Sequence, residues 1–322
     1  MNISKCVCLV LVSLLVVGVL AGVGSAQDAK LTKTKALPAP VSKYATHAPI
    51  RINSDADFNM QFPGRVISGY DINGAGKGCC IFIGNCTQAF TVKDCYIHDS
   101  NGNNVIYFCN RGLYLYKTND GTISNNNCSS NTDGIGLEYS NSNMIENNTC
   151  AINYWSAINL YNSTNTILTN NTCMANHINI YLYSCNKTTL IGNMCKLGLY
   201  GINLFDSYNN TLAFNNCLKN TAMDNSGAGI FMRYSTNNTL MNNSCSNNDY
   251  GIKLYYSSKN ILIKNTCTLN NDDGILLSSM SNSNTLSGII AHGATMVFIY
   301  SHTVTIMYSH ITISQKMNME SR

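Results

Sequence analysis

GIKLYYSSKNILIKNTCTLNNDD, residues 251–273, is one copy of a unit that the chain repeats. A glycine opens the unit, two short runs with alternating apolar residues follow, and a cysteine closes it. Successive copies are 22 or 23 residues apart, with one step of 28. A fixed period of this size is typical of a solenoid, in which each repeat packs only against its neighbours. The opening position falls at Gly112, Gly134, Ala157, Asn179, Gly201, Gly229, Gly251 and Gly274, and the closing cysteine at Cys128, Cys150, Cys173, Cys195, Cys217, Cys245 and Cys267.

The apolar positions of the unit recur from copy to copy. The residue after the opening position is Ile or Leu, as at Ile252, and the residue two further on is Leu or Met, as at Leu254. Leu262 marks a third such position, five residues before the cysteine. Alternation within a run indicates a β-strand, and recurrence between copies indicates parallel pairing with the next copy. We therefore predict an all-β chain in which residues 50–290 form a parallel β-helix, a single-stranded solenoid of about 9 coils of 22–23 residues.

An asparagine stands two residues before every closing cysteine, as Asn265 does before Cys267. Asparagine tolerates the left-handed conformation that a tight corner needs, and stacked amides can hydrogen-bond along the axis of a stack. We predict that these asparagines adopt the left-handed conformation, hydrogen-bond to one another along the axis, and have a structural role.

The cysteines raise the question of disulfides. Seven of the 15 recur at one position of the unit. Neighbouring coils lie about 4.8 Å apart, whereas a disulfide needs Cβ atoms about 3.5–4.5 Å apart. We predict buried free thiols in this column, and expect that any disulfide involves cysteines outside it, among them Cys79, Cys80, Cys86, Cys109 and Cys185.

The N-terminus predicts export. An apolar run follows Lys5 and ends at small residues, so residues 1–26 resemble a signal peptide cleaved after Ala26. The alternative is an uncleaved anchor, which would be the chain's contact with the membrane. We interpret residues 27–49 as a linker and residues 291–322 as an irregular, β-prone tail or cap.

Only 11% of residues are charged and the net charge is +4, which argues against a nucleic-acid partner.

The unit itself, Gly-Ile-x-Leu, a polar turn, Asn-x-Thr-Leu and Asn-Asn-x-Cys, resembles the parallel β-helix repeats of NosD-like proteins, especially those of archaeal cell surfaces. The resemblance spans about residues 49–290 and begins with a similar lead-in that contains Pro49 and Val66. It implies a right-handed parallel β-helix related to carbohydrate-binding and sugar-cleaving β-helices. The members that give the family its name assist copper loading of a periplasmic reductase, but no copper-ligand or catalytic motif accompanies the repeat. Copper sites need clustered donors, and the histidines are spread over His47, His98, His177, His292, His302 and His310, so copper is not the expected cofactor.

Acidic residues gather at one predicted corner. Asp224 lies in the longest spacing between copies, and Asp249 and Asp272 each stand two residues before an opening glycine, with Asp273 beside them. Stacked carboxylates with oxygen ligands can hold Ca²⁺, and with Arg233 as base Asp249 and Asp272 could serve a lyase-like reaction. The alternative is that Asp before Gly is ordinary turn chemistry.

An aromatic stripe is predicted on the outer face of the strands, four residues after the opening position. Such rings suit stacking on sugars or docking a partner, although cross-strand stacking could equally explain them. Nine Asn-x-Ser/Thr sequons follow the predicted signal peptide and add the possibility of glycosylation. The stripe consists of Tyr116, Tyr161, Tyr183, Phe205 and Tyr255.

Taken together, the sequence favours a secreted or cell-surface β-helix module for recognition or structure, which binds carbohydrate or another cell-envelope component and is not catalytic. One alternative is a calcium-assisted polysaccharide lyase or epimerase. The other is a periplasmic copper-loading accessory protein of NosD type.

Overall fold

The computed structural model describes residues 44–76, 78–100, 110–300, 306–309 and 312–313. The predicted signal peptide and most of the predicted linker lie outside these residues, so export by this signal stays a prediction. Cys109 and the side chains of His292, His302 and His310 also lie outside the described part. In that part, no helix has the length and apolar character needed to cross a membrane.

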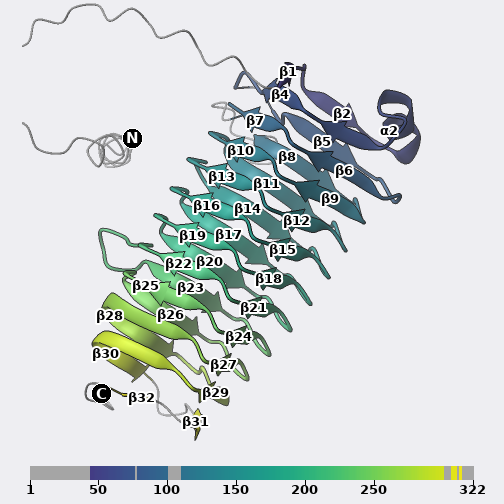
Figure 1. Cartoon of the computed structure of the whole chain (residues 1–322). Coiled ribbons are helices and arrows are strands. Elements are labelled where there is room, and N and C mark those ends of the chain that lie inside the picture. The colour runs from purple at the N-terminus through teal and green to yellow at the C-terminus, as the bar shows by residue number, and fades with distance from the viewer. Residues whose placement is uncertain (1–43, 77, 101–109, 301–305, 310–311, 314–322) are drawn as a thin grey trace, which may run out of the picture. The chain divides into compact units, whose positions relative to one another are not determined.

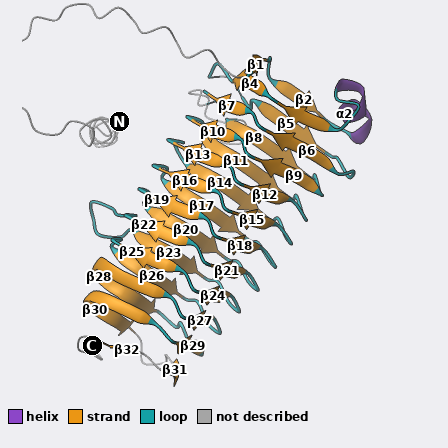
Figure 2. Cartoon of the chain, in the orientation of Figure 1, coloured by secondary structure: helices purple, strands orange, loops and turns teal. Residues whose placement is uncertain are grey.

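The described chain winds into coils that stack along one axis, and each strand pairs in parallel with its counterparts in the coils before and after it (Figure 1). Strands account for most of every coil, and loops form the corners (Figure 2). The predicted right-handed parallel β-helix is confirmed. The second sheet has eleven described strands, one per coil, so the stack is longer than the nine coils that we predicted.

Each regular coil holds three strands. The first strands are β2 (Ile50–Ile52), β5 (Ile81–Gly84), β8 (Arg111–Tyr116), β11 (Asp133–Glu138), β14 (Ser156–Tyr161), β17 (Ile178–Tyr183), β20 (Tyr200–Phe205), β23 (Ala228–Arg233) and β26 (Tyr250–Tyr255). The second strands form their own sheet and are β3 (Val66–Ser68), β6 (Phe90–Lys93), β9 (Gly121–Ser124), β12 (Met144–Glu146), β15 (Ile167–Thr169), β18 (Thr189–Ile191), β21 (Thr211–Ala213), β24 (Thr239–Met241), β27 (Ile261–Ile263), β29 (Asn284–Ser287) and β31 (Ile306–Ser309). The third strands are β1 (Ala45–Thr46), β4 (Tyr70–Asn73), β7 (Tyr96–His98), β10 (Asn127–Ser129), β13 (Thr149–Ala151), β16 (Thr172–Met174), β19 (Met194–Lys196), β22 (Asn216–Leu218) and β25 (Ser244–Ser246).

The stacking continues past residue 290, where the predicted regular coils end. β28 (Thr266–Ser278) unites a third strand and a first strand in one continuous element. β30 (Ile290–Tyr300) pairs with β28 over its whole length, and β32 (Thr312–Ile313) pairs with the start of β30. Part of the segment that we interpreted as an irregular tail therefore extends the solenoid.

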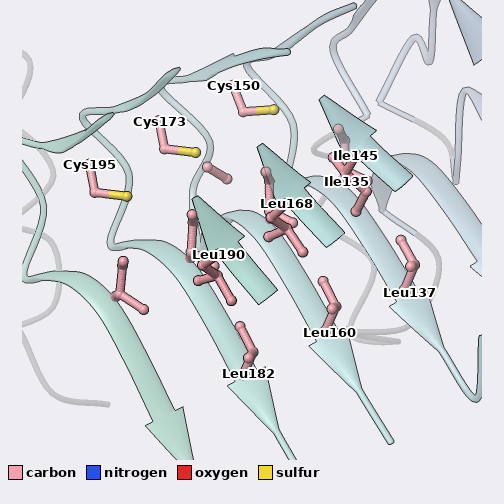
Figure 3. Packing of buried hydrophobic residues seen from close by; sticks show 14 of the residues in the cluster. Ile135, Leu137, Ile145, Cys150, Leu160, Leu168, Cys173, Leu182, Leu190 and Cys195 are labelled. Atoms are coloured by element: carbon pink, nitrogen blue, oxygen red, sulfur yellow. The ribbon is translucent and has the colours of Figure 1, made fainter. Parts of the chain in front are cut away.

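The predicted inward ladders form the core. Leu160 pairs in register with Leu182 and Leu168 with Leu190, and all four side chains are fully buried. Figure 3 shows these residues pointing into the space between the strands, each above its copy in the next coil. Each such side chain stabilises the fold by roughly 1.5–3 kcal/mol, although a single coil could not bury any of them alone.

The cysteine column runs through the same interior. Cys150, Cys173 and Cys195 pair in register and lie in one line (Figure 3). All twelve described cysteines are free and buried, which confirms the prediction of buried thiols. Burial raises the pKa of Cys128 and Cys195 well above the usual value. These thiols therefore stay protonated and pack as small apolar groups.

Four residues with left-handed backbone conformation turn each regular coil. In the coil that begins with β20 they are Asp206, Asn209, Phe214 and Lys219, with φ between 48° and 57°, and the longer loop before β23 adds Asn225 with φ 56°. Only Gly, Asn and Asp adopt this conformation readily, so corners that carry other residues are held by the stacking on either side.

The asparagine column before the cysteines forms a hydrogen-bonded ladder. Asn148 Nδ2 donates to Asn171 Oδ1 at 3.0 Å, and Asn171 Nδ2 donates to Asn193 Oδ1 at 2.9 Å. The predicted bonding along the axis is confirmed. The prediction that these asparagines are left-handed is wrong, because the positive φ belongs to the residue before, as at Asn147 with φ 55°.

A second amide ladder, three residues after the cysteines, explains the small opening residues. A Cβ added at Gly201 would lie 2.5 Å from the Gly229 carbonyl oxygen of the next coil and 3.0 Å from Nδ2 of Asn220 in the same coil, so the ladder and the neighbouring backbone together leave no room for a side chain. One coil reverses this arrangement, with Asn179 at the opening position and Gly198 in the ladder. Asn179 fills the gap, because its Oδ1 accepts from Asn176 Nδ2 at 2.9 Å and its Nδ2 donates to Asn220 Oδ1 at 3.0 Å.

The N-terminal end carries the helix α2 (Asp55–Gln61), which buries Phe58. Ser54 caps the helix by accepting from the Asp57 amide. Asp55 accepts hydrogen bonds from Thr87 and Gln88. Burial raises the pKa of Asp55, but these bonds and the Arg65 guanidinium outweigh burial and lower it below 3.8.

The first prediction concerns the Asn179 and Gly198 pair. Asn179→Gly should lower the free energy of unfolding by about 1–3 kcal/mol, since Asn176 and Asn220 lose buried partners. Gly198→Asn alone should also destabilise, because its Cβ would lie 2.9 Å from Asn179 Nδ2. The double variant rebuilds the arrangement of the other coils and should recover most of both losses in urea unfolding. Strictly additive losses would contradict this account.

The second prediction concerns pH. A carboxyl whose pKa is lowered by folding stabilises the fold above its unfolded pKa, and that contribution is lost as the pH falls through the folded pKa. Asp55→Asn should therefore lower the melting temperature at pH 6, and the difference from wild type should shrink as the pH falls below 3.8. A difference that is constant from pH 6 to pH 2.5 would show that the Asp55 charge is not involved.

Candidate functional site

The predicted aromatic stripe lies at the ends of the first strands. The register aligns Tyr116, Glu138, Tyr161, Tyr183 and, one coil further, Phe205. Arg233 and Tyr255 continue the column. The stripe is therefore one line on the outer face, interrupted by two charged residues.

The middle of the stripe is a stack of three rings. Tyr161 and Tyr183 have centroids 5.0 Å apart and planes 13° apart, and Tyr183 and Phe205 follow at 5.1 Å and 5°. The ring faces within the stack cover one another, so the stack presents edges to solvent. A sugar that stacks on a ring needs an open face, which Tyr183 does not offer.

Two tyrosines that the sequence analysis missed restore the continuity of the stripe. Where the strand supplies Glu138 or Arg233, the next residue is Tyr139 or Tyr234. Tyr139 lies nearly perpendicular to Tyr161 at 5.8 Å, and Tyr234 to Phe205 at 5.7 Å. A sequence signal existed, since each tyrosine directly follows a charged residue in the aromatic column.

We call this set the aromatic ridge. Its members touch in sequence along seven coils, with ring centroids no more than 6.3 Å apart. Tyr139 is 44% exposed and Tyr234 is 42% exposed, more than the rings of the stack. The ridge consists of Tyr116, Tyr139, Tyr161, Tyr183, Phe205, Tyr234, Tyr255 and Tyr256.

Arg233 lies against the aromatic ridge and not at the acidic corner. Its guanidinium lies over Phe205 at 5.3 Å and over Tyr234 at 5.2 Å. Arg233 pairs with Tyr255, six residues along the chain from Asp249, which is about 20 Å at 3.3 Å per residue. The structure therefore does not bring together Arg233, Asp249 and Asp272, the set considered for a lyase.

Asp249 fixes the position of the loop between β22 and β23 through hydrogen bonds. Its side chain is buried, and Oδ2 accepts from the amides of Ala222 at 2.8 Å and Gly227 at 3.0 Å. Oδ1 accepts from Asn271 Nδ2 at 2.9 Å. Figure 1 shows this loop projecting between β22 and β23. Asp249 thus has a structural role.

A lysine supplies the positive charge at this corner. Lys253 lies over the Tyr250 ring at 4.2 Å. Burial lowers the pKa of Lys253, and attraction to the corner carboxylates opposes this effect. Asp224 is exposed and accepts from Ser226 within its own loop. The carboxylates that interact with Lys253 are those of Asp224, Asp249, Asp272 and Asp273.

A buried polar cluster on the same outer face escaped the sequence analysis. Arg111 Nε lies 3.3 Å from Asp133 Oδ2, and its Nη1 lies 3.6 Å from Glu138 Oε2. The Tyr114 hydroxyl donates to the same Glu138 oxygen at 2.7 Å, and burial raises the pKa of Tyr114. Gly136 leaves the room that Arg111 fills, since a Cβ there would clash with Arg111 Cδ. The Glu138 carboxylate is therefore already engaged.

Histidines line an open pocket near the N-terminal end of the stack. The pocket measures about 530 Å³ and includes His47, Asp71, Asn73 and His98. His98 is bonded at both ring nitrogens, to Asp71 at 2.9 Å and Asp99 at 2.8 Å. These bonds leave His98 without a nitrogen for a metal.

The donors in the described part do not fit a copper site. No group of three or more His, Cys, Asp or Glu side chains in that part could hold a metal ion. The column cysteines are sealed in the core, and His177 stacks on Trp155 at 4.7 Å.

The third prediction tests the acidic corner. Asp249→Ala removes three hydrogen-bond acceptor contacts and should lower the free energy of unfolding by about 1–3 kcal/mol, followed as melting temperature. Asp224→Ala, the matched control, should change it little. The loss should be equal with millimolar Ca²⁺ and with EDTA. Stabilisation of the wild type by Ca²⁺ that disappears in Asp249→Ala would make the corner a calcium site.

The comparisons with solved structures concern the fold. An alginate lyase from Paenibacillus shares 10% identity at a TM-score of 0.55, over 80% of this chain and 99% of that one. The Dettilon tailspike protein shares 14% at 0.53, over 78% and 61%. A variant of the periplasmic alginate epimerase AlgG shares 16% at 0.50, over 75% and 62%. The chain thus spans less than two thirds of the tailspike and of this epimerase chain.

The sequence comparisons concern the family. No curated protein sequence matches the chain. The family model described as periplasmic copper-binding protein (NosD) matches residues 67–221 and 153–288. These matches cover most of the described coils, and the description agrees with an exported protein. The chain belongs to the NosD family of parallel β-helix proteins.

Proposed function

We propose that this protein is an exported module that binds an extended carbohydrate along the aromatic ridge without cleaving or epimerising it. The observation that carries the proposal is the continuity of the ridge, which is maintained even in the two coils where the strand supplies a charged residue. From Tyr116 to Tyr255 it spans six coil steps, or about 29 Å. A surface of this length suits a polymer better than a small molecule.

Tyr139 and Tyr234 are the stacking platforms in this proposal. Each meets the end of the three-ring stack with its plane nearly perpendicular to the stack, by 85° and 78°. Neither ring therefore lies flat on the stack, and both are more exposed than the rings within it. The two lie four coil steps apart, about 19 Å, so one chain of several sugars could contact both. The stack between them holds the platforms rigidly, which lowers the entropy cost of binding.

The engaged state of the acidic groups supports binding without catalysis. Asp249 accepts hydrogen bonds from backbone amides, and Glu138 and Asp133 are paired with Arg111. Arg233 lies about 20 Å along the strand from Asp249. Known β-helix relatives by fold include an alginate lyase and alginate epimerases, so a polysaccharide partner is compatible with the architecture.

Copper handling, which the family description names, receives no support from the described donors. His98 has both nitrogens bonded to carboxylates, and the column thiols lie inside the core, where burial raises the pKa of Cys128 and Cys195. We therefore do not assign a copper-loading role to these residues.

The fourth prediction tests the ridge. The double variant Tyr139→Ala, Tyr234→Ala should weaken binding to a soluble polysaccharide about tenfold or more, as expected for two aromatic contacts of about 0.5–1.5 kcal/mol each. Affinity electrophoresis against a panel of soluble polysaccharides, followed by calorimetry, measures this. The matched control is Tyr154→Ala, Phe214→Ala, whose side chains are 66% and 60% exposed away from the ridge.

The control should bind like wild type, and melting temperatures should confirm that both double variants fold. Equal loss in both pairs would remove the ridge as the binding surface. If the wild type binds no polysaccharide of the panel, the proposed function is wrong.

A further inference from the structure

Arg233 is an exposed guanidinium held within an aromatic surface. It stands in the ridge column between Phe205 and Tyr255, which are its register partners. Its Cζ lies 5.3 Å from the Phe205 centroid, 5.2 Å from Tyr234 and 5.6 Å from Tyr255. Three rings therefore surround one flat cation on the outer face.

Within the described part of the chain, Arg233 makes no side-chain hydrogen bond or ion pair. The other three described arginines differ. Arg65 pairs with Asp55 at 2.8 Å, Arg51 donates to backbone carbonyls, and Arg111 lies against Asp133 and Glu138. The guanidinium N–H groups of Arg233 therefore face solvent.

The carboxylates near the ridge do not neutralise Arg233. Glu138, the acidic residue of the column, is 14% exposed and is held by Tyr114 and Arg111. Asp206 follows Phe205, and its amide donates to the Arg233 carbonyl at 3.0 Å. Its carboxylate accepts from Ser184 Oγ at 3.4 Å, in the coil on the side opposite to Arg233. Lys117 adds a second cation, with Nζ 5.2 Å from the Tyr116 centroid. Two cations, Lys117 and Arg233, therefore lie along the ridge, and Asp206 is the exposed carboxylate beside it.

A guanidinium fork recognises a carboxylate through two parallel hydrogen bonds. The rings beside Arg233 limit its motion, so less entropy is lost when the fork binds. Lys117 and Arg233 are five coil steps apart, about 24 Å, which places both within reach of one polymer lying along the ridge.

We propose that the ridge selects an acidic polysaccharide, with Arg233 binding a carboxylate of a uronate unit. This inference rests on the proposed function and names the class of polymer. Arg233 contributes specificity through charge, while Tyr139 and Tyr234 contribute contact area that a neutral polymer could share.

The test compares polygalacturonate with fully methyl-esterified polygalacturonate of the same length, which keeps the sugar chain but removes the charge. The wild type should bind the acid form about tenfold or more tightly at low salt, the size of one charge-assisted hydrogen-bonded contact. Arg233→Gln should abolish the preference, and Arg233→Lys should keep part of it, because charge remains without the fork. Lys219→Gln, at an exposed corner outside the ridge, is the charge-matched control and should keep the full preference.

The outcomes separate the two proposals. Equal affinity for both polymers, with binding still lost in Tyr139→Ala, Tyr234→Ala, would overturn the selectivity and leave the ridge as a binding surface. An acid preference that survives in Arg233→Gln would also overturn the role of Arg233. Absence of binding to the acid polymer, its ester and neutral glucans alike would overturn the proposed function itself. Melting temperatures of the Arg233 variants exclude misfolding as the cause of lost binding.

Discussion

The buried amide ladders are the interaction on which the coils depend. A corner interrupts the strand and leaves backbone N–H groups inside the molecule, where an unpaired donor is costly. The asparagine of the next coil accepts that hydrogen, as when the Asn126 amide donates to Asn148 Oδ1 at 3.0 Å. Its own Nδ2 donates to the Ile123 carbonyl one coil back. Each coil is thus completed only by its neighbours.

This constraint explains which positions of the unit are free to vary. The opening residue is small because the backbone carbonyl of the next coil and a ladder amide both pack against it, and the coil with Asn179 shows that the opening and ladder positions vary together. Left-handed corners are held from both sides, so Phe214 and Lys219 are accepted where asparagine would be the local preference. The outward residues of the first strands are not subject to these packing constraints. The ridge and the Arg111 cluster occupy these positions.

The outer face therefore separates into engaged and available groups. Most carboxylates that could act in catalysis already have partners within the protein. Asp249 accepts hydrogen bonds from a loop, and Glu138 and Asp133 are paired with Arg111. By contrast, Arg233 and the rings around it are available. A rigid solenoid suits such a surface, since in-register stacking repeats the outward spacing of about 4.8 Å per coil over a length that a flexible loop could not hold.

The coil could be predicted from the amino-acid pattern, because strand alternation and the period of 22 or 23 residues leave parallel stacking as the way to bury Ile252, Leu254 and their copies. The same pattern identified the thiol column and the bonded asparagines. Which functional candidates are available depends instead on contacts between coils. The partners of Asp249, Glu138 and Arg233 come from other coils, and ring orientation at Tyr139 and Tyr234 depends on the stack beside them. Such contacts join residues more than twenty positions apart, so no local pattern could specify them.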